Sequence, residues 1–445
     1  MSENNCQELL ALLEDENDQL RRVMNLDYST GLPLRRVLED RLRPRIITGD
    51  DTPFAIGVIR LDERFHLRSL ESEVSGLISF SVGQRLSELV PERVYQSWRT
   101  DEFVVLVEDE DALNELTQFG DRIRKVVMAP FQNLGYEIRL GCHVGFARFP
   151  DHGTTVADLL GNAGIAMGIV ERREGTSIVY DAAMGRRRRR VFEIEHALAA
   201  EIQNGLEGFS LAFQPVVDGQ RRIRGAEALS RWTNTDMGPI SPFEFIPVAE
   251  QFGQIQVLGL WVAYTAGSIA TRWTRTDRRH PFVSINVSTV QLTDSDFARR
   301  FVEILESAGG DPSRFRVELT ESVIVENPDA ARNTLESLRD HGVHLLIDDF
   351  GTGYSSFSYL HTLPIATIKI AKEFVETITG SAHSRAIVRS IIDVAHGIGG
   401  TALAEGVETD EQFQILMEEG CDYFQGFLFG RPQSVSGLED LEVSL

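Results

Sequence analysis

The chain has 445 residues, a length that predicts two or three domains. Apolar residues make up 42% of it and charged residues 25%, which is the mixture of an ordinary globular protein with a sizeable core. The net charge of −23 argues against broad nucleic-acid binding, because phosphate contacts need clustered cations.

Cysteine usage and the start of the chain point to a reducing compartment. Cys6, Cys142 and Cys421 lie far apart without a CxxC pair, so neither a disulfide framework nor a zinc site is suggested. The first residues, MSENNCQELL, lack the basic and apolar stretches of a signal peptide. Apolar runs stay below the ~18–20 residues that a membrane span needs. We therefore expect a cytoplasmic protein without a membrane segment.

In chain order, the first predicted elements form an N-terminal helix and a mixed α/β domain. Residues 1–26 contain a helix whose apolar residues fall near a heptad spacing, which fits either an amphipathic helix or a short dimerising coiled coil. Residues 27–182 alternate strand-like runs with helical patterns. Residues 183–195 carry five consecutive arginines, 186–190, which we interpret as the water-facing start of a linking helix rather than a nucleic-acid or lipid site.

Residues 196–445 predict a (β/α)8-type barrel. Eight strand-like runs can be marked, and most are separated by helical patterns: LAFQPVV, RIRGAEALSRW, FVSINVS, FRVELTES, VHLLIDDF, TIKIA, TALAEGV and YFQGFLF. A parallel connection needs a dozen or more residues. Only a short polar turn around Asp218–Arg221 joins the first two runs, so we expect an antiparallel first strand.

Polar side chains stand where these strands end, which is the face where such barrels perform chemistry. The set is Glu227, Asn286, Glu318, Asp348, Asp349, Lys369, Glu405 and Gln425. A structural network of hydrogen bonds and salt bridges is the alternative, but five acids with one cation would repel strongly. Divalent ions resolve the imbalance. All-oxygen ligation suits Mg²⁺ or Mn²⁺.

The adjacent carboxylates Asp348 and Asp349 suggest two ions rather than one. Strand side chains alternate between faces, but both can turn to the rim where the chain leaves the sheet. One carboxylate would then bridge two ions while its neighbour holds one. Paired ions ~3.5–4 Å apart stabilise the attacking and leaving oxygens in phosphoester hydrolysis.

Ordered motifs across the C-terminal domain resemble EAL-domain cyclic-di-GMP phosphodiesterases. They are FQPVV, EALSRW, FIPVAE, SINVS, VELTES, DDFGTGYSS, IKIAKEFV, AEGVET and CDYFQGFLFGRP. The resemblance implies hydrolysis of cyclic di-GMP to linear pGpG by a homodimer that uses two Mg²⁺ or Mn²⁺ ions.

The resemblance also implies roles for single residues. It implies metal ligands at Glu227, Asn286, Glu318, Asp348 and Asp349, with Asp348 as the bridge. It implies that Lys369, Glu405 and Gln425 act on the nucleophilic water or on transition-state charge. Arg231 would contact a ligand phosphate, Gln214 a guanine edge, and Glu321 and Glu408 would support the loop after Asp349.

One position departs from the family. Where the family has KID, this chain has Lys369, Ile370 and Ala371. The missing carboxylate weakens the expectation of fast turnover but leaves the expectation of nucleotide binding intact.

The first domain resembles GGDEF diguanylate cyclases through DYSTGLPLRR, SWRTDEFVVL and GNAGIAM, and its departures predict that cyclase activity is lost. Arg99 and Thr100 replace the two glycines of the signature, and any Cβ there obstructs the nucleotide. Arg60 stands at a metal-binding aspartate, although Asp62 survives. Further departures are Glu171 at a phosphate-binding lysine and VPER (90–93) at the inhibitory RxxD motif. Asp101 and Glu102 are then remnants.

Three functions compete at this point. The first is an active phosphodiesterase with a regulatory or dimerising first domain, for which GTP is a candidate ligand. The second is a cyclic-di-GMP receptor with slow or absent turnover, which Ala371 favours. The third, a diguanylate cyclase, is the weakest, because its signature is degraded.

Overall fold

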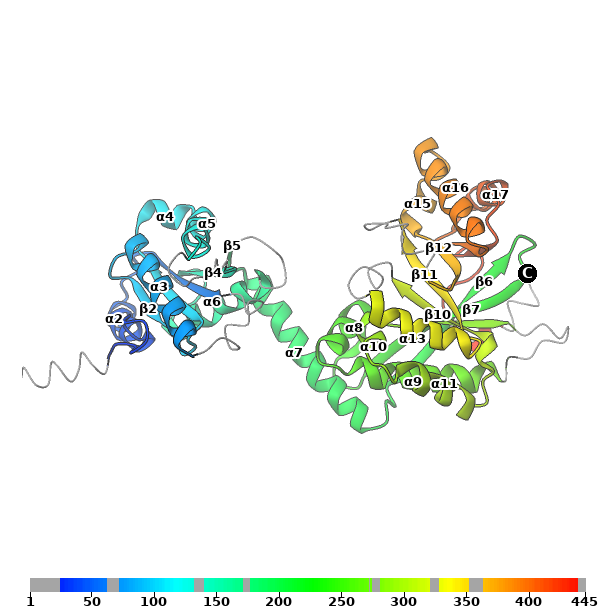
Figure 1. Ribbon diagram of the computed structural model, residues 1–445, viewed down its shortest axis with the longest axis horizontal. Helices are drawn as coiled ribbons and strands as arrows, with labels where there is room; N and C mark the ends of the chain where they lie inside the picture. The colour runs from blue at the N-terminus through cyan, green and yellow to red at the C-terminus, as the bar shows by residue number, and fades with distance from the viewer. Residues whose placement is uncertain are drawn as a thin grey trace, which may run out of the picture. The chain divides into compact units, whose positions relative to one another are not determined.

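The computed structural model describes residues 25–61, 72–131, 140–170, 177–271, 273, 281–320, 328–351 and 363–438. The chain divides into two compact units, Met1–Arg190 and Val191–Leu445 (Figure 1). Residues 1–24, which hold nearly all of the expected N-terminal helix, lie outside the described residues, as do Asp62, Glu171 and Glu321.

The first unit is a twisted sheet covered by helices on both faces. In chain order its described elements are α2 (Arg35–Ile47), β1 (Phe54–Leu61), α3 (Ser72–Leu89), β2 (Val94–Gln96), β3 (Glu102–Val107), α4 (Glu110–Asn114), α5 (Leu116–Val127), β4 (Cys142–Phe149), α6 (Val156–Val170) and β5 (Ser177–Val179). Within the described residues the strand order is β2-β3-β1-β4-β5. Only β4 and β5 pair in parallel among these neighbours.

Strand β1 shows why the sheet has two covered faces. Its side chains alternate, as in any strand, and both sets are apolar. Ala55 and Ile59 belong to the core cluster that includes residues of α3 and α5. Ile56 and Val58 belong to the cluster that includes residues of α2 and α6. The run FAIGVIRL is therefore buried on both sides rather than half exposed.

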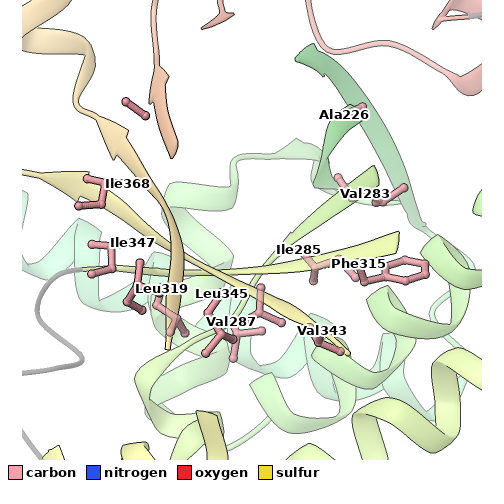
Figure 2. Packing of buried hydrophobic residues seen from close by; sticks show 14 of the residues in the cluster. Ala226, Val283, Ile285, Val287, Phe315, Leu319, Val343, Leu345, Ile347 and Ile368 are labelled. Carbon is pink, nitrogen blue, oxygen red and sulfur yellow. The ribbon is translucent and has the colours of Figure 1, made fainter. Parts of the chain in front are cut away.

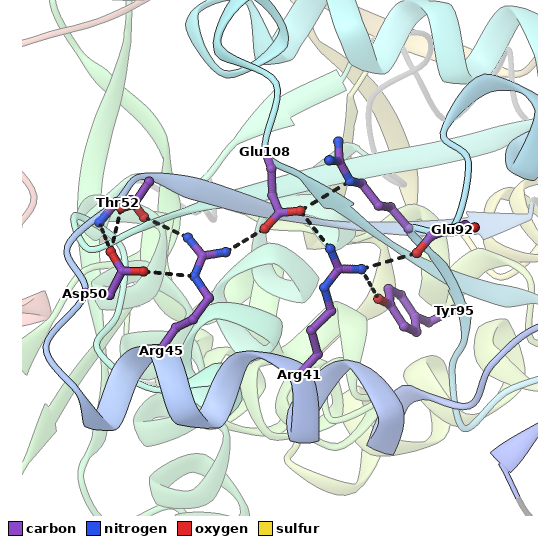
Figure 3. A network of polar contacts seen from close by, with 8 residues as sticks. Arg41, Arg45, Asp50, Thr52, Glu92, Tyr95 and Glu108 are labelled. Carbon is purple, nitrogen blue, oxygen red and sulfur yellow. Dashed lines mark hydrogen bonds and ion pairs between the residues drawn. The ribbon is translucent and has the colours of Figure 1, made fainter.

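Helix α2, which packs against one face of this sheet, is also contacted by one carboxylate, that of Glu108, just after β3 (Figure 3). Its oxygens lie 3.0 Å from Arg41 Nη2 and 2.5 Å from Arg45 Nη1, both on α2. Arg93 Nε, just before β2, lies 3.2 Å from the same carboxylate. Since the side chain of Glu108 is only 18% exposed, these pairs are screened less than surface pairs.

Helix α7 (Ala182–Gln203) runs from the first unit into the second. Arg186–Arg190 lie in it, and the first four of these arginines are exposed. The described elements that follow are β6 (Phe209–Asp218), β7 (Ile223–Asn234), β8 (Gly238–Ile240), α8 (Pro242–Gln251), α9 (Ile255–Ala270), β9 (Phe282–Asn286), α10 (Thr289–Leu292), α11 (Phe297–Ser307), the 3₁₀ turn η2 (Pro312–Arg314), β10 (Phe315–Thr320), α13 (Pro328–Asp340), β11 (His344–Phe350), β12 (Ile365–Ile370), α15 (Lys372–Glu376), α16 (Ala382–Gly397), β13 (Thr401–Ala404), α17 (Asp410–Glu418) and β14 (Tyr423–Gln425).

The second unit is a closed barrel with one reversed strand, as predicted. Over the described ranges the strand order is β6-β14-β13-β12-β11-β10-β9-β7-β8, and an additional pairing of β6 with β7 closes eight strands into a barrel. Strand β6 is antiparallel to both of its barrel neighbours, β7 and β14. The remaining barrel strands, β7 and β9 to β14, pair in parallel.

Alternation along the barrel strands separates an apolar outer face from a polar interior. On β10, Phe315, Val317 and Leu319 are buried in the large apolar cluster that the strands share with the surrounding helices. Figure 2 shows Phe315 and Leu319 with neighbouring members of this cluster. The intervening Glu318 therefore points into the barrel. The same outward packing fixes the inward direction of Glu227 and Lys369.

Among the residues described, no helix combines the length and apolar content needed to cross a lipid bilayer.

Replacing Glu108 with glutamine should loosen α2. The change removes the counter-charge that Arg41, Arg45 and Arg93 share, although Arg45 keeps Asp50 at 3.4 Å, and we expect it to cost about 1–2 kcal/mol, or roughly a tenfold rise in local opening. Hydrogen exchange of the α2 amides in the full chain measures this. Asp40→Asn, the same charge change on exposed Asp40 of α2, is the matched control. Equal exchange in the two variants would show that the three arginines do not hold the helix.

Candidate functional site

The carboxyl ends of the parallel barrel strands gather the polar residues at one rim. Most of these residues lie at or near the ends of their strands: Asn286 on β9, Glu318 on β10, Asp348 and Asp349 on β11, Lys369 on β12, Glu405 directly after β13 and Gln425 on β14. Glu227 lies within the longer strand β7, near the end of the segment that pairs with β9. The pairing register keeps these ends level, because Asn286 pairs with Glu318 and Thr320 pairs with Asp348.

The ammonium group of Lys369 lies at the centre of this cluster. Its Nζ is 2.5 Å from Glu318 Oε2, 2.5 Å from Glu405 Oε1 and 3.0 Å from Asp348 Oδ1. Glu227 Oε2 lies 3.7 Å away. Because Lys369 is 1% exposed, these are ion pairs shielded from water, and the pKa of Lys369 is raised well above its usual value by the surrounding carboxylates, against the effect of burial.

Two amide side chains hold Glu227 in place. Asn286 Nδ2 donates to Glu227 Oε1 at 2.7 Å, and Gln425 Nε2 donates to Glu227 Oε2 at 2.7 Å. Gln425 Nε2 also lies 3.2 Å from Gln214 Oε1, on the reversed strand β6. The antiparallel register sets Gln214 opposite Glu227, which brings the first strand into the rim.

Strand β11 departs from regular geometry at the two aspartates. Its pairing with β12 shifts register between Ile347 and Phe350, so Asp348 and Asp349 fall in the irregular step. Asp349 has a φ of 51°, in the left-handed region that aspartate tolerates better than most residues. Asp349 N donates to Asp348 Oδ1 at 3.0 Å. The irregularity explains how neighbouring side chains reach one cluster despite strand alternation.

Burial and mutual repulsion raise the pKa of several of these acids. Burial first, and then Glu227, raise the pKa of Glu318 to about 8 although Lys369 opposes the shift. Burial, opposed by Lys369 and helped by Asp348, raises the pKa of Glu405 to about 8. Burial and the neighbouring Asp348 also raise the pKa of Asp349. One lysine therefore does not neutralise the cluster.

The donor set fits hard divalent cations. Asp348, Asp349 and Glu405 each offer a carboxylate oxygen, and these oxygens lie within 4.8 Å of one another. The cluster offers only oxygen atoms as ligands. Mg²⁺ and Mn²⁺ favour such all-oxygen sites more than zinc does. The repulsion that raises the pKa values is the same repulsion that bound cations would relieve.

The remaining residues predicted for the site are placed less centrally. Arg231 Nη1 donates to the carbonyl of Ser230 at 2.9 Å and its side chain is part-exposed. Glu408 is exposed and pairs with Lys372 at 3.2 Å. Glu321 and the loop it was expected to support lie outside the described residues.

Glu250 is a residue that the sequence analysis did not single out. Ser288 Oγ, two residues beyond Asn286, donates to Glu250 Oε1 at 2.6 Å. Ser288 also caps α10 through a capping box with Gln291, so the chain turns sharply after Asn286. The signal was present in the motifs FIPVAE and SINVS, which end in this acid and this serine.

Gly426 explains why glycine follows Gln425. A Cβ at this position would lie 2.1 Å from the carbonyl oxygen of Val407 and 2.3 Å from its nitrogen. Backbone atoms cannot yield as a flexible side chain would, so the close approach that fixes Gln425 requires the absence of a side chain.

Ala371 stands at the N-cap of α15, directly after the strand that carries Lys369. Its side chain offers no hydrogen bond to the first turn, whereas Ser288 and Thr409 cap the helices after two other rim strands. Aspartate is among the preferred residues at an N-cap. The alanine therefore removes both a charge next to the cluster and a helix cap.

In the first unit, each of the two acids of the SWRTDEF signature, Asp101 and Glu102, forms an ion pair with an arginine. Arg60 Nη2 lies 2.8 Å from Glu102 Oε2, while Ser97 Oγ donates to Glu102 Oε1 at 2.6 Å. Arg99 Nη2 lies 2.8 Å from Asp101 Oδ2. Burial acts to raise the pKa of Asp101, but the hydrogen bond and charge of Arg99 outweigh it. The pKa of Asp101 is therefore lowered.

Comparison with known proteins places both units. A family model for the EAL domain matches residues 195–432, and one for the diguanylate cyclase GGDEF domain matches residues 24–176. The cyclic di-GMP phosphodiesterase PdeR of Escherichia coli is 30% identical over 95% of this chain and 64% of its own length. Protein sll1895 of Synechocystis is 31% identical over 92% of this chain and 59% of its own.

A solved structure described as the PaMucR phosphodiesterase in complex with c-di-GMP is 34% identical. It matches 54% of this chain and 99% of its own with a TM-score of 0.51. This chain spans 40% to 59% of the length of the first four curated relatives. The ordered rim motifs and the match over residues 195–432 agree, and the chain belongs to the EAL-domain family, with a GGDEF domain preceding its EAL domain.

Proposed function

We propose that the barrel hydrolyses cyclic di-GMP to linear pGpG and uses two divalent ions, Mg²⁺ or Mn²⁺. The observation that carries this proposal is the set of five carboxylates around a single buried lysine at the barrel mouth. The similarity to PdeR and to the PaMucR complex supports the same substrate.

Five residues would hold the ions: Glu227, Asn286, Glu318, Asp348 and Asp349. When bound, the ions would neutralise charge on the scissile phosphate and favour deprotonation of the attacking water. Asn286 and Gln425 fix the carboxylate of Glu227, so that it meets a ligand without reorganising.

Lys369 and Glu405 are the groups that would act on the reacting atoms. The ammonium of Lys369 is buried and permanently charged, so it can stabilise the anionic oxygens of the phosphodiester as charge develops. Glu405, 2.5 Å from Lys369 Nζ, has a pKa raised to about 8 by burial and can hold or release the proton of a water. Gln425 would orient that water, Arg231 a phosphate and Gln214 a guanine edge.

The first domain would have a regulatory or dimerising role rather than a cyclase activity. A metal ion at Glu102 would have to displace the guanidinium of Arg60, and one at Asp101 that of Arg99. Carboxylates already paired with cations have little affinity for a further cation. Accumulation of cyclic di-GMP from GTP would contradict this assignment.

A second candidate, a receptor for cyclic di-GMP with little turnover, is favoured by Ala371. This residue is 2% exposed and follows the strand of Lys369, so its missing carboxylate lies beside the cluster. The same binding surface would then serve to report the ligand rather than to cleave it.

Glu227→Gln should abolish hydrolysis. Glutamine keeps the shape of Glu227 but removes the charge that an ion needs, so we expect the rate of pGpG formation to fall by about 100-fold or more. Product analysis of the full chain with cyclic di-GMP and Mg²⁺ or Mn²⁺ measures this rate. Glu303→Gln, the same change on the exposed face of α11, should leave it unchanged. Wild-type protein that is saturated with cyclic di-GMP yet forms no pGpG would refute the proposed activity.

Metal binding should strengthen as pH rises towards 8. Glu318 and Glu405 have pKa values raised to about 8, so they hold protons at lower pH, and ions must displace them. The metal-free fold itself loses stability as pH rises from the ordinary glutamate value of 4.5 through 8, because the folded state binds these protons more tightly than the unfolded chain.

Thermal unfolding checks this dependence. The same concentration of Mg²⁺ or Mn²⁺ should raise the midpoint more at pH 8.5 than at pH 6.5, because proton competition weakens binding at the lower pH. Glu405→Gln removes one of the two protons and should flatten the difference. Equal shifts at both pH values in the wild-type protein would show that the ions do not compete with these protons.

Ala371→Asp should raise turnover. The new carboxylate would cap α15 and add negative charge beside the cluster, which favours metal binding. Ala371→Asn separates these effects, because asparagine caps a helix without adding charge. Faster pGpG formation in the aspartate variant alone supports the charge, an equal gain in both supports the cap, and no gain in either would show that Ala371 does not limit the reaction.

A further inference from the structure

A cavity in the first unit lies at the opposite end of the sheet from the SWRTDEF signature. Its volume is about 390 Å³, within the range of small-molecule sites. Residues 113–118, at the junction of α4 and α5, form one wall, and the end of β4 with the loop after it, within 148–152, forms another. Arg148 pairs with Ala55 at the start of β1, whereas Arg60, beside the signature, lies towards the end of that strand. The cavity is therefore separate from the signature residues.

Arg148 gives this cavity a cation that no carboxylate of the described residues pairs with. The side chain is part-buried, and its Nη2 donates to the carbonyl oxygen of Leu113 at 3.1 Å. Two acids, Glu115 and Asp151, also line the cavity, but neither forms an ion pair with Arg148. A planar guanidinium that lines a cavity without a counter-charge favours a ligand that brings a carboxylate or another planar anionic group.

Neutral donors line the cavity together with Arg148. His152 Nδ1 accepts from the backbone amide of Arg148 at 3.0 Å, so the ring proton lies on Nε2. Burial lowers the pKa of His152, and Arg148 lowers it further against the effect of Asp151, so the ring is neutral at pH 7. The amides of Thr117 and Gln118 precede the first hydrogen bond of α5, and no side chain of the described residues caps this turn. These groups can share a carboxylate with Arg148 without adding charge.

The remaining lining disfavours a simple anion. Glu115 and Asp151 are exposed acids that would repel a phosphate or a dicarboxylate, whereas an ammonium group would complement them. The apolar part of the lining comes from Leu113, Leu116 and Val179, which suit an aliphatic group. One cation, two acids and an aliphatic wall therefore match a molecule that carries a carboxylate, an ammonium group and an aliphatic side chain.

We propose that this cavity binds a free aliphatic α-amino acid of the leucine type. Its carboxylate would lie on Arg148 and the neutral donors, its ammonium group between Glu115 and Asp151, and its side chain against Leu113, Leu116 and Val179. This site concerns the first unit alone and is independent of hydrolysis at the barrel.

Tyr180 connects the cavity to the start of helix α7. The ring of His152 packs edge-on against that of Tyr180, with centroids 5.6 Å apart. A Cβ added at Gly185 of α7 would lie 2.2 Å from the hydroxyl oxygen of Tyr180, so the phenol packs closely on the helix. Asp181, the next residue, accepts from the amide of Ala183 at 2.8 Å where α7 begins. A ligand that restrains His152 should therefore slow local opening of the first turns of α7.

Equilibrium dialysis of the full chain tests the proposal. The probes are leucine, isoleucine and valine, with isocaproate and isoamylamine, which are leucine without its ammonium group and leucine without its carboxylate, and inorganic phosphate. We expect leucine to bind about tenfold or more tightly than either truncated molecule, because each loses hydrogen bonds to charged groups. Isocaproate or phosphate binding as tight as that of leucine would overturn the assignment to an amino acid. Absence of binding by all three amino acids at millimolar concentration would overturn the site itself.

Two variants separate the two charged ends of the ligand. Arg148→Met should weaken leucine and isocaproate binding about tenfold, the loss expected for one hydrogen bond to a charged group. Arg122→Met, the same change on the exposed face of α5 outside the lining, is its control. Asp151→Asn, at an exposed position, should weaken leucine binding and leave isocaproate binding unweakened, with Asp158→Asn as control. Leucine binding that neither Arg148→Met nor Asp151→Asn weakens would overturn the placement in this cavity.

Hydrogen exchange of residues 180–190 in the full chain measures the connection to α7. Saturating leucine should slow exchange there in the wild type, and the same concentration should slow it less in Arg148→Met. Unchanged exchange in the leucine-saturated wild type would overturn the connection through His152 and Tyr180.

Discussion

The repulsion among buried carboxylates is the constraint on which the second unit depends. Four acids lie within 3.7 Å of the ammonium of Lys369, and the pKa values of two of them rise to about 8. A cluster of this kind is tolerated only because the strands hold it rigidly and because cations or protons neutralise it. The proposed hydrolysis and the need for neutralising cations therefore arise from the same cluster of carboxylates.

Strand alternation connects this charge cluster to the stability of the barrel. On β10 the outward residues fill the apolar cluster shared with the helices, while Glu318 points inward. Burial of the apolar layer offsets the free-energy cost of placing polar groups inside the barrel, since burial of each large apolar side chain contributes about 1.5–3 kcal/mol. A one-residue slip in any strand would exchange the two faces, so the apolar pattern that forms the core also fixes the register of the site.

Much of this could be predicted from the sequence, and the remainder depends on contacts that no local pattern records. The barrel, its reversed first strand and the domain order follow from run lengths, the short turn near Asp218 and the motifs. The register shift at Asp348 and Asp349 does not, because it depends on how β11 pairs with β12. The pairing of Arg60 with Glu102 likewise joins residues far apart in the chain.

The pairing of β6 with β14 has a consequence for synthesis on the ribosome. The first barrel strand, β6, cannot complete its pairing until the last strand, β14, has been made. Gln425 on β14 also supplies one of the two side-chain amides that hold Glu227 in place. The first unit is contiguous in sequence and can fold as soon as it emerges, whereas the barrel cannot close until about residue 425 has been made. A nascent chain therefore carries a folded first unit while its acid cluster is still unassembled.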